Sequence, residues 1–385
     1  MSYTCPFCFT LVDLKNTWFQ CSIPSCSQPD ELRTRFEQDL QPQQQIPSNV
    51  KIIQYHTTFQ GNNQHGGVCP KCHRNTTIRV CPSCHSEFPP NIENLSNVIF
   101  AVVGARSTGK SHYIAVLINQ LKRLYNKFNW SLCALGDETI DLYRRKFYEP
   151  LYMQHIRLKQ TQGAAADADV KKPLIYSLEL YRDNNTKSVV LAFFDSAGED
   201  LTSVQNISKV NRYIAHASGI ILLLDPLQIS SIRQKVKSND MPVAEIAHCQ
   251  NHIIEFLVNF IKSRRRNTES IPLAITFSKI DLLNGLFAEE YGRFETPVQH
   301  HKHVINLNEI EGNSDFIKNW LDNEGAECIQ AGRRFDSRFF GVSALGKDPK
   351  KDNNGNLIIP GGPQPMHVED PFLWLLYKND LIQGK

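Results

Sequence analysis

One motif constrains the fold of this chain more than any other feature, because it matches the pattern G-x-x-x-x-G-K-[ST] in full. It directly follows an apolar, β-rich run at 98–103 and precedes a helical pattern at about 112–128. In such a strand–loop–helix unit, successive backbone N–H groups wrap around phosphate oxygens. The sequence therefore predicts a nucleotide phosphate loop. Its residues are Gly104, Ala105, Arg106, Ser107, Thr108, Gly109, Lys110 and Ser111.

Two residues of this loop have specific expected roles. Lys110 is expected to reach the β- and γ-phosphates, and the Ser111 hydroxyl is expected to bind Mg²⁺. Because the pattern alone predicts only a nucleoside triphosphate with Mg²⁺, the later segments must narrow the function.

A β-hairpin is predicted next, from an alternating run at 174–181, a turn signal at 183–185 and an apolar run at 188–194. Its second strand leads into Asp195-Ser196-Ala197-Gly198. We expect the Asp195 carboxylate to hold the Mg²⁺ shell and the Gly198 N–H to contact the γ-phosphate. This contact is lost when the γ-phosphate leaves, as in a switch driven by hydrolysis.

Two further buried strands are predicted at 219–224 and 271–277, and the second ends in Ser278-Lys279-Ile280-Asp281. The Asp281 carboxylate can accept both the ring N–H and the exocyclic amine of guanine, a donor pair that adenine lacks. The Lys279 stem would cover the base and ribose. A later strand at 339–342 leads to Ser343 and Ala344, whose turn can offer a backbone N–H to the guanine carbonyl.

The cysteines form a second distinctive pattern, since eight of the eleven lie in the first 84 residues as four close pairs. Pairs spaced this way supply thiolates for tetrahedral Zn²⁺, and four thiolates leave no open position, so we expect structural zinc sites. Disulfides are the alternative, but they need an oxidising compartment. The pairs are Cys5/Cys8, Cys21/Cys26, Cys69/Cys72 and Cys81/Cys84. The other three cysteines, Cys133, Cys249 and Cys328, occur singly and are expected to be small buried side chains.

Chain order predicts that the first two pairs share one zinc and the last two pairs share another. A crossed arrangement, in which the first pair shares a metal with the last pair, remains open. His73 and His85 each follow a cysteine and are not expected to be ligands. The predicted organisation is a zinc module at 1–34, a linker with possible strands at 35–66, a second zinc module at 67–92 and a nucleotide-binding domain at 95–385.

The order of motifs from about 96 to 385 resembles the translation-factor-related (TRAFAC) class of P-loop GTPases. With the N-terminal cysteine pairs, the chain is similar to bacterial double-GTPase domain proteins, which are expected to act in conflict or anti-phage systems beside GTPase-associated partners. The resemblance implies an α/β P-loop GTPase fold. It also implies a mostly parallel six-stranded sheet, with one antiparallel strand and helices on both faces, preceded by zinc ribbons. GTP or GDP, Mg²⁺ and two structural Zn²⁺ are the implied cofactors.

The resemblance also implies catalytic residues, and some of them depart from the usual pattern. Lys110 is one. Glu199 stands where many relatives carry a water-orienting Gln, so hydrolysis is expected to be slow without a partner. Arg106 lies beside the γ-phosphate in the geometry of the class, although a solvent-facing position is an equal alternative. Thr161 is the leading candidate for a Mg²⁺-binding switch threonine, and Thr139 is the second choice.

Composition limits the partners. The net charge is +3 and the mean hydropathy is −0.35, with no apolar run of membrane-spanning length and no signal-peptide pattern. We therefore expect a cytoplasmic protein without a membrane span, with any nucleic-acid contact confined to the zinc modules. Three hypotheses follow: a GTP-hydrolysing switch, a GTP-binding scaffold with little turnover, and a nucleic-acid-binding protein regulated by nucleotide.

Overall fold

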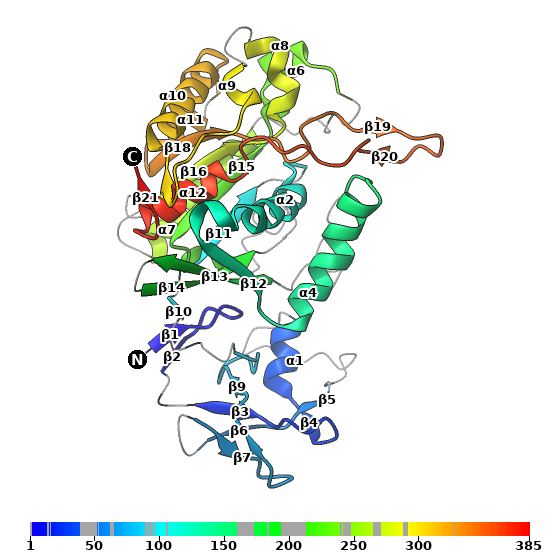
Figure 1. Cartoon of the computed structure of the whole chain (residues 1–385), viewed down its shortest axis with the longest axis vertical. Helices are drawn as coiled ribbons and strands as arrows, with labels where there is room; N and C mark the ends of the chain where they lie inside the picture. Colours follow the sequence, from blue (N-terminus) through cyan, green and yellow to red (C-terminus); the bar gives the residue numbers. More distant parts are fainter. Residues whose placement is uncertain are drawn as a thin grey trace.

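The computed structural model places a larger α/β unit, residues 95–385, above a smaller N-terminal region that is rich in short strands (Figure 1). Within the described part of the chain, no helix combines the length and the apolar character that crossing a bilayer requires. The structure describes residues 2–13, 15, 17–38, 52, 54–61, 65–88, 92, 95–96, 98–104, 107–159, 173–182, 185–193, 213–238, 241, 248–264, 271–287, 292–326 and 328–385.

Four strands form the central parallel sheet, in the order β11-β15-β16-β18. Each of the first three strands is buried along its whole length, as expected for a parallel sheet covered on both faces. All three pairings are parallel, so the carboxyl ends of these strands lie at one edge. The strands are β11 (Phe100–Gly104), β15 (Gly219–Leu224), β16 (Pro272–Phe277) and β18 (Asp336–Gly341).

A second four-stranded ladder has the order β10-β14-β13-β12. The predicted hairpin is confirmed, since β13 and β14 pair antiparallel from Leu174↔Phe193 to Arg182↔Asn185. The P-loop GTPase fold is likewise present, but its strands pair as two ladders of four rather than as one sheet of six. The strands of this ladder are β10 (Leu95–Ser96), β12 (Trp130–Ala134), β13 (Leu174–Arg182) and β14 (Asn185–Phe193).

Helices cover both faces of the parallel sheet, as the sequence predicts. Alternation along β11 separates the two faces. Phe100 and Val102 pack in a core with α2 (Lys110–Arg123) and α12 (Asp370–Lys378). Ala101 and Val103 belong to a second core, which also contains residues of α7 (His248–Arg264) and α10 (Leu307–Asn323).

One helix, α4, continues directly into a π-helical segment that contains Pro150. Short helices and strands connect the two ladders and their covering helices. They are α3 (Tyr125–Phe128), α4 (Asp137–Tyr143), η2 (Arg144–Met153), η5 (Pro226–Gln228), α6 (Ser230–Lys235), η6 (Ile280–Leu283), α8 (Asn284–Phe287), α9 (Gly292–Glu295), β17 (Val304–Ile305), α11 (Cys328–Gly332), β19 (Lys350–Lys351), β20 (Leu357–Ile358) and β21 (Gln383–Gly384).

The N-terminal region is interleaved rather than built as two successive modules. Its three-stranded sheet has the order β6-β3-β9, which joins residues 18–20, 58–60 and 79–80. Strands therefore occur inside the segment predicted as a linker. The elements are β1 (Ser2–Thr4), β2 (Leu11–Asp13), β3 (Trp18–Gln20), β4 (Ser27–Pro29), α1 (Glu31–Glu37), β5 (Gln54–His56), β6 (Thr58–Gln60), β7 (Gly67–Val68), β8 (Asn75–Thr76) and β9 (Arg79–Val80).

Candidate functional site

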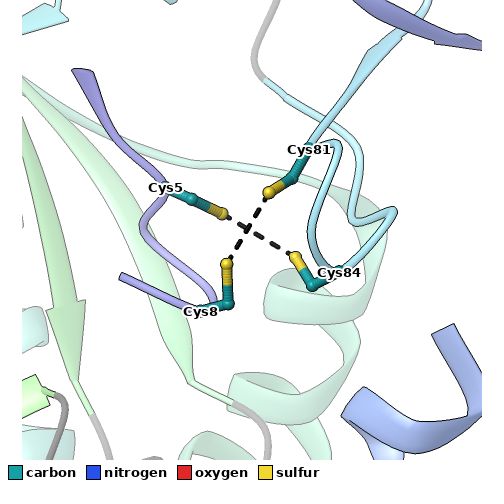
Figure 2. A group of neighbouring side chains, drawn as sticks. All are labelled: Cys5, Cys8, Cys81 and Cys84. Atoms are coloured by element: carbon teal, nitrogen blue, oxygen red, sulfur yellow. Dashed lines mark hydrogen bonds between the residues drawn. The ribbon is translucent and has the colours of Figure 1, made fainter. Parts of the chain in front are cut away.

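The eight N-terminal cysteines gather in two groups of four, and the grouping is crossed. Figure 2 shows the first cysteine cluster, with all four side chains pointing at one centre. The prediction from chain order is therefore wrong, and the crossed alternative is confirmed. Chain order failed because the segment between the pairs folds back, so that β3 pairs with both β6 and β9. The first cysteine cluster is Cys5, Cys8, Cys81 and Cys84; the second cysteine cluster is Cys21, Cys26, Cys69 and Cys72.

The sulfur spacings distinguish a metal site from disulfides. In the first cysteine cluster, the Sγ atoms of Cys5 and Cys84 lie 3.8 Å apart, and those of Cys8 and Cys81 lie 3.6 Å apart. In the second cysteine cluster, the corresponding distances are 3.4 Å for Cys21–Cys72 and 3.7 Å for Cys26–Cys69. A tetrahedron with Zn–S bonds of about 2.3 Å puts its sulfurs about 3.8 Å apart, whereas a disulfide needs about 2.0 Å. The donor set therefore fits Zn²⁺ and excludes disulfides within these clusters.

Three of the four pairs share one backbone turn, which explains why the Cys-Pro-x-Cys sequence recurs. The residue after the second cysteine donates its N–H to the carbonyl of the first cysteine at 2.9 Å each time. That residue is Phe9, His73 or His85, with φ of 59°, 58° and 54° respectively. His73 and His85 thus occupy a turn position next to a cysteine and are not members of either cluster, as predicted. The His85 ring instead contacts Asp30, with Nδ1 2.7 Å from Oδ2.

The other three cysteines were expected to be small buried side chains. Cys328 is buried, but Cys133 is exposed on β12, so that part of the expectation is wrong.

The phosphate loop leaves the end of β11 and enters α2 at Lys110, which is buried. Gly104 has no room for a side chain, since a Cβ there would lie 2.8 Å from both the Leu223 carbonyl oxygen and Thr108 Oγ1. Gly109 has φ of 84°, the left-handed conformation that favours glycine. Both glycines of the pattern are therefore required by the backbone. The tight turn and the buried lysine at a helix N-terminus fit the phosphates of a nucleotide.

The base motif lies at the neighbouring strand ends. Ser278 follows β16 and donates both its N–H, at 3.0 Å, and its hydroxyl, at 3.2 Å, to the Leu224 carbonyl of β15. Asp281 lies in η6, and Ser343 follows β18; a side-chain hydrogen bond joins the two residues. The structure thus brings Ser278, Asp281 and Ser343 together, as the sequence predicts. Burial raises the pKa of the Asp281 carboxyl despite the hydrogen bond with Ser343, which acts in the opposite direction.

Asp225, at the end of β15, is a residue whose role the sequence did not reveal. Its side chain is buried, and its Oδ2 lies 2.6 Å from Lys279 Nζ. Its Oδ1 accepts the Leu227 N–H at 2.9 Å, which caps η5. Asp225 therefore fixes the lysine that is expected to cover the base. The signal was available, because a carboxylate ends a strand next to the strand that leads into Lys279.

His112 is a second residue that the sequence did not reveal. It directly follows Ser111 and is buried, and its Nε2 accepts the Leu158 N–H at 3.1 Å. Burial lowers the pKa of His112 to about 3, with further lowering from Arg157 and Lys279, so the ring is neutral. The neutral ring holds the first turn of α2 against residue 158, just before the segment that contains Thr161.

Several predicted residues lie outside the described part of the chain: Ala105, Arg106, Thr161, Asp195, Gly198 and Glu199. Thr139, the second choice for the switch threonine, is buried in α4. Its Oγ1 donates to the Leu135 carbonyl at 3.1 Å and accepts the Ile175 N–H at 3.3 Å, so this hydroxyl supports the start of the hairpin.

The parallel sheet, the phosphate loop at the end of β11 and the base motif at the end of β16 define the P-loop GTPase class. The sequence model of the Double-GTPase 2 family matches residues 98–313, more than half of the chain. The chain therefore belongs to the Double-GTPase 2 family.

Individual relatives are more distant. A putative ESX-1 scaffolding and assembly protein, SaeC, of Mycolicibacterium smegmatis is 27% identical over 323 residues, covering 77% of this chain and 79% of SaeC. The Arl6 (BBS3) small GTPase of Trypanosoma brucei aligns with a TM-score of 0.33 and 11% identity, over 74% of this chain and 98% of that chain. The signal recognition particle receptor complex of Chaetomium thermophilum aligns with a TM-score of 0.32 and 12% identity, over 66% and 94%. TM-scores this low carry no argument about function.

Proposed function

We propose that this protein is a Mg²⁺-dependent molecular switch that binds and hydrolyses GTP. One observation carries the proposal: the phosphate loop and the guanine motif lie at the carboxyl ends of β11 and β16, on either side of β15. In open α/β sheets, ligands bind outside this edge. Asp281 is hydrogen-bonded to Ser343 at this edge, and its carboxylate can accept hydrogen bonds from the two donors of guanine.

The residues of the loop would divide the work of holding GTP. Backbone N–H groups from 104 to 111 surround the phosphates, and Lys110 neutralises charge on the β- and γ-phosphates. When bound, Mg²⁺ supplies further neutralisation of the phosphate oxygens, and Ser111, Asp195 and Thr161 are the side chains proposed to hold it. The backbone N–H of Gly198 would donate a hydrogen bond to the γ-phosphate.

Turnover is proposed to depend on Glu199 and Arg106. A carboxylate at 199 can orient a water, but it also repels the γ-phosphate, so slow intrinsic hydrolysis is expected. Arg106 would place a positive charge near the γ-phosphate. Replacement of Arg106 by Gly should change the single-turnover rate constant of GTP hydrolysis. An unchanged rate constant would show that Arg106 faces solvent and has no role in hydrolysis.

The zinc-binding region is proposed to recruit protein partners. The related SaeC protein is named for scaffolding and assembly, which supports a role in building a multiprotein complex. That relative does not support the anti-phage role expected from the resemblance, so assembly is the favoured context. Eight thiols in metal-type clusters also fit a reducing compartment, and we include a cytoplasmic location in the proposal.

A GTP-binding scaffold with little turnover is the second candidate, because the name of SaeC describes scaffolding and Glu199 replaces the usual Gln. Turnover measured with and without cell extract separates the two. A nucleic-acid-binding protein regulated by nucleotide is the third candidate, and it requires salt-dependent binding of DNA or RNA.

The test of the leading proposal is competition of GTP, GDP and ATP for a fluorescent guanine nucleotide, followed by phosphate release, on wild type and Lys110→Ala. We expect GTP and GDP to compete at least a hundredfold better than ATP, and Lys110→Ala to lose binding. Equal competition by ATP would refute the assignment of Asp281.

A further inference from the structure

A seam separates the two ladders of the nucleotide-binding unit. Leu95 and Ser96 of β10 pair with β14, but four residues later Phe100 of β11 pairs with β15. Among the described strands, β11 and β14 lie close together without a ladder of their own between them. These are the strands that lead into the phosphate loop and towards Asp195, so their spacing matters for the site.

The Tyr213 hydroxyl fills this seam. It accepts the Val102 N–H of β11 at 3.3 Å. Its proton can be donated to the Ala192 carbonyl of β14, at 2.6 Å, or to the Phe100 carbonyl of β11. Tyr213 is buried, and unpaired backbone groups at such a depth are costly. One side chain therefore replaces the backbone hydrogen bonds that would otherwise join the two strands.

The ring of Tyr213 packs against Phe9, which directly follows Cys8 of the first cysteine cluster. Phe9, whose N–H closes the Cys5 turn, lies with its ring centroid 5.7 Å from that of Tyr213. The same Phe9 ring stacks on His216, with centroids 6.3 Å apart. Phe9 is only 2% exposed and belongs to the same core as Tyr213 and residues from all four strands of the parallel sheet. The turn that carries two of the cysteines is thus part of the packing around the seam.

We propose that Tyr213 is a positioning residue of the nucleotide site and that its ring is held by Phe9, the residue that follows Cys8 of the first cysteine cluster. Its hydroxyl sets the separation of the strand that carries the phosphate loop from the strand that leads to Asp195. The separation of these two strands thereby adjusts how well the chain holds Mg²⁺ with GTP. This inference rests on the proposed function, because it concerns the same site, and it adds a contact through Phe9 between the N-terminal region and that site.

The test compares Tyr213→Phe, which removes only the hydroxyl, with Tyr143→Phe as the matched control. Tyr143 is also buried, and its hydroxyl donates to a backbone carbonyl, that of Ala115, at 2.9 Å. We expect Tyr213→Phe to raise the Mg²⁺ concentration for half-maximal GTP binding about tenfold, with GDP affinity in excess EDTA nearly unchanged. Tyr143→Phe should lower the melting temperature by a similar amount without that shift.

A second measurement needs no nucleotide. Hydrogen exchange of the peptide that covers residues 98–104 should become at least severalfold faster in Tyr213→Phe and remain unchanged in Tyr143→Phe. The variant Phe9→Leu keeps an apolar side chain but removes the ring contacts, and it should reproduce both effects more weakly.

The outcomes separate this inference from the proposed function. Wild type that binds GTP with Mg²⁺, together with a Tyr213→Phe variant whose Mg²⁺ dependence and hydrogen exchange match wild type, would overturn the positioning role alone. Wild type that binds no guanine nucleotide would overturn the proposed function. Faster exchange in Tyr213→Phe would then still support the bridge across the seam, and unchanged exchange would overturn it.

Discussion

The two cysteine clusters use the same chemistry but belong to different parts of the core. The first cysteine cluster shares its packing with Tyr213 and the parallel sheet. The second cysteine cluster forms a separate small core, whose buried members are Phe19, Cys21, Cys26, Phe59 and Cys69. A core this small cannot offset chain entropy without a metal. One cysteine cluster is therefore continuous with the core of the nucleotide-binding unit, whereas the other belongs to a core of its own region.

Removal of one ligand from each cluster gives the largest expected effect. Cys84→Ser and Cys72→Ser should each lower the zinc content by one metal per chain, with the loss of about 10 kcal/mol of metal-binding free energy. Cys84→Ser should also lower the melting temperature of the nucleotide-binding unit, while Cys72→Ser should expose only the N-terminal region to protease. Cys133→Ser is the control, because Cys133 is exposed and outside both clusters. An equal fall in the melting temperature of the nucleotide-binding unit in Cys84→Ser and Cys72→Ser would show that the two clusters do not differ in this way.

A methyl group at the phosphate loop should give the next largest effect. In Gly104→Ala the Cβ would lie 2.8 Å from the Leu223 carbonyl oxygen, so the loop must shift. We expect GTP affinity to fall at least a hundredfold and stability to fall by about 1–3 kcal/mol. Isothermal calorimetry and thermal melting measure the two quantities. Gly285→Ala, where no atom lies within 4 Å of the new Cβ, should leave both unchanged. Unchanged GTP affinity in Gly104→Ala would show that the nucleotide does not bind at this phosphate loop.

The base assignment is tested by Asp281→Asn. In the proposed site the Asp281 carboxylate would accept two hydrogen bonds from guanine, whereas the Asn amide would accept one and donate another, which matches xanthine. GTP affinity should fall about a hundredfold, and xanthosine triphosphate should become the better ligand. Competition binding measures both. A variant that still prefers GTP would show that Asp281 does not contact the base.

The smallest expected effect concerns pH. Since the pKa of His112 is lowered to about 3 in the folded protein, only the unfolded chain takes up a proton between about pH 6.5 and 3. The contribution of His112 to the free energy of unfolding is therefore complete above about pH 6.5. It is lost as the pH falls, by about 2 kcal/mol from pH 7 to pH 5. His112→Gln keeps an acceptor for the Leu158 N–H but does not titrate, so it should lose less stability over that range.

The control for this prediction is a second histidine. His301→Gln, at an exposed position, should follow the wild-type pH dependence. Burial also lowers the pKa of His300, to about 4, whereas burial raises the pKa of Glu369 to about 7, which acts in the opposite direction. Both groups are present in every variant, so only the difference from wild type is interpreted. Parallel curves for wild type and His112→Gln would refute the role assigned to His112.

Most of the nucleotide-binding unit could be predicted because its signals are local. The hairpin at 174–193 follows from alternation around a turn, and α2 at Lys110–Arg123 follows from the helical pattern after the phosphate loop. The phosphate loop is recognisable because one strand, one turn and one helix suffice to build it. His112 was missed because its partner, Leu158, lies far along the chain and no spacing reveals the contact. Asp225 was missed although a carboxylate at a strand end was a signal, because its ion pair with Lys279 depends on which strands are neighbours in the sheet.

The sequence alone was enough to predict four cysteine pairs with the spacing of metal ligands and a phosphate loop between a parallel strand and a helix. Each of these features needs only neighbours along the chain. The tertiary structure decided which pairs share a cluster, since every pair has the same local geometry and only the path of the chain brings Cys8 to Cys81 rather than to Cys21. It also decided that Tyr213 bridges β11 and β14, because hydrogen bonding across a seam depends on strands far apart in the sequence.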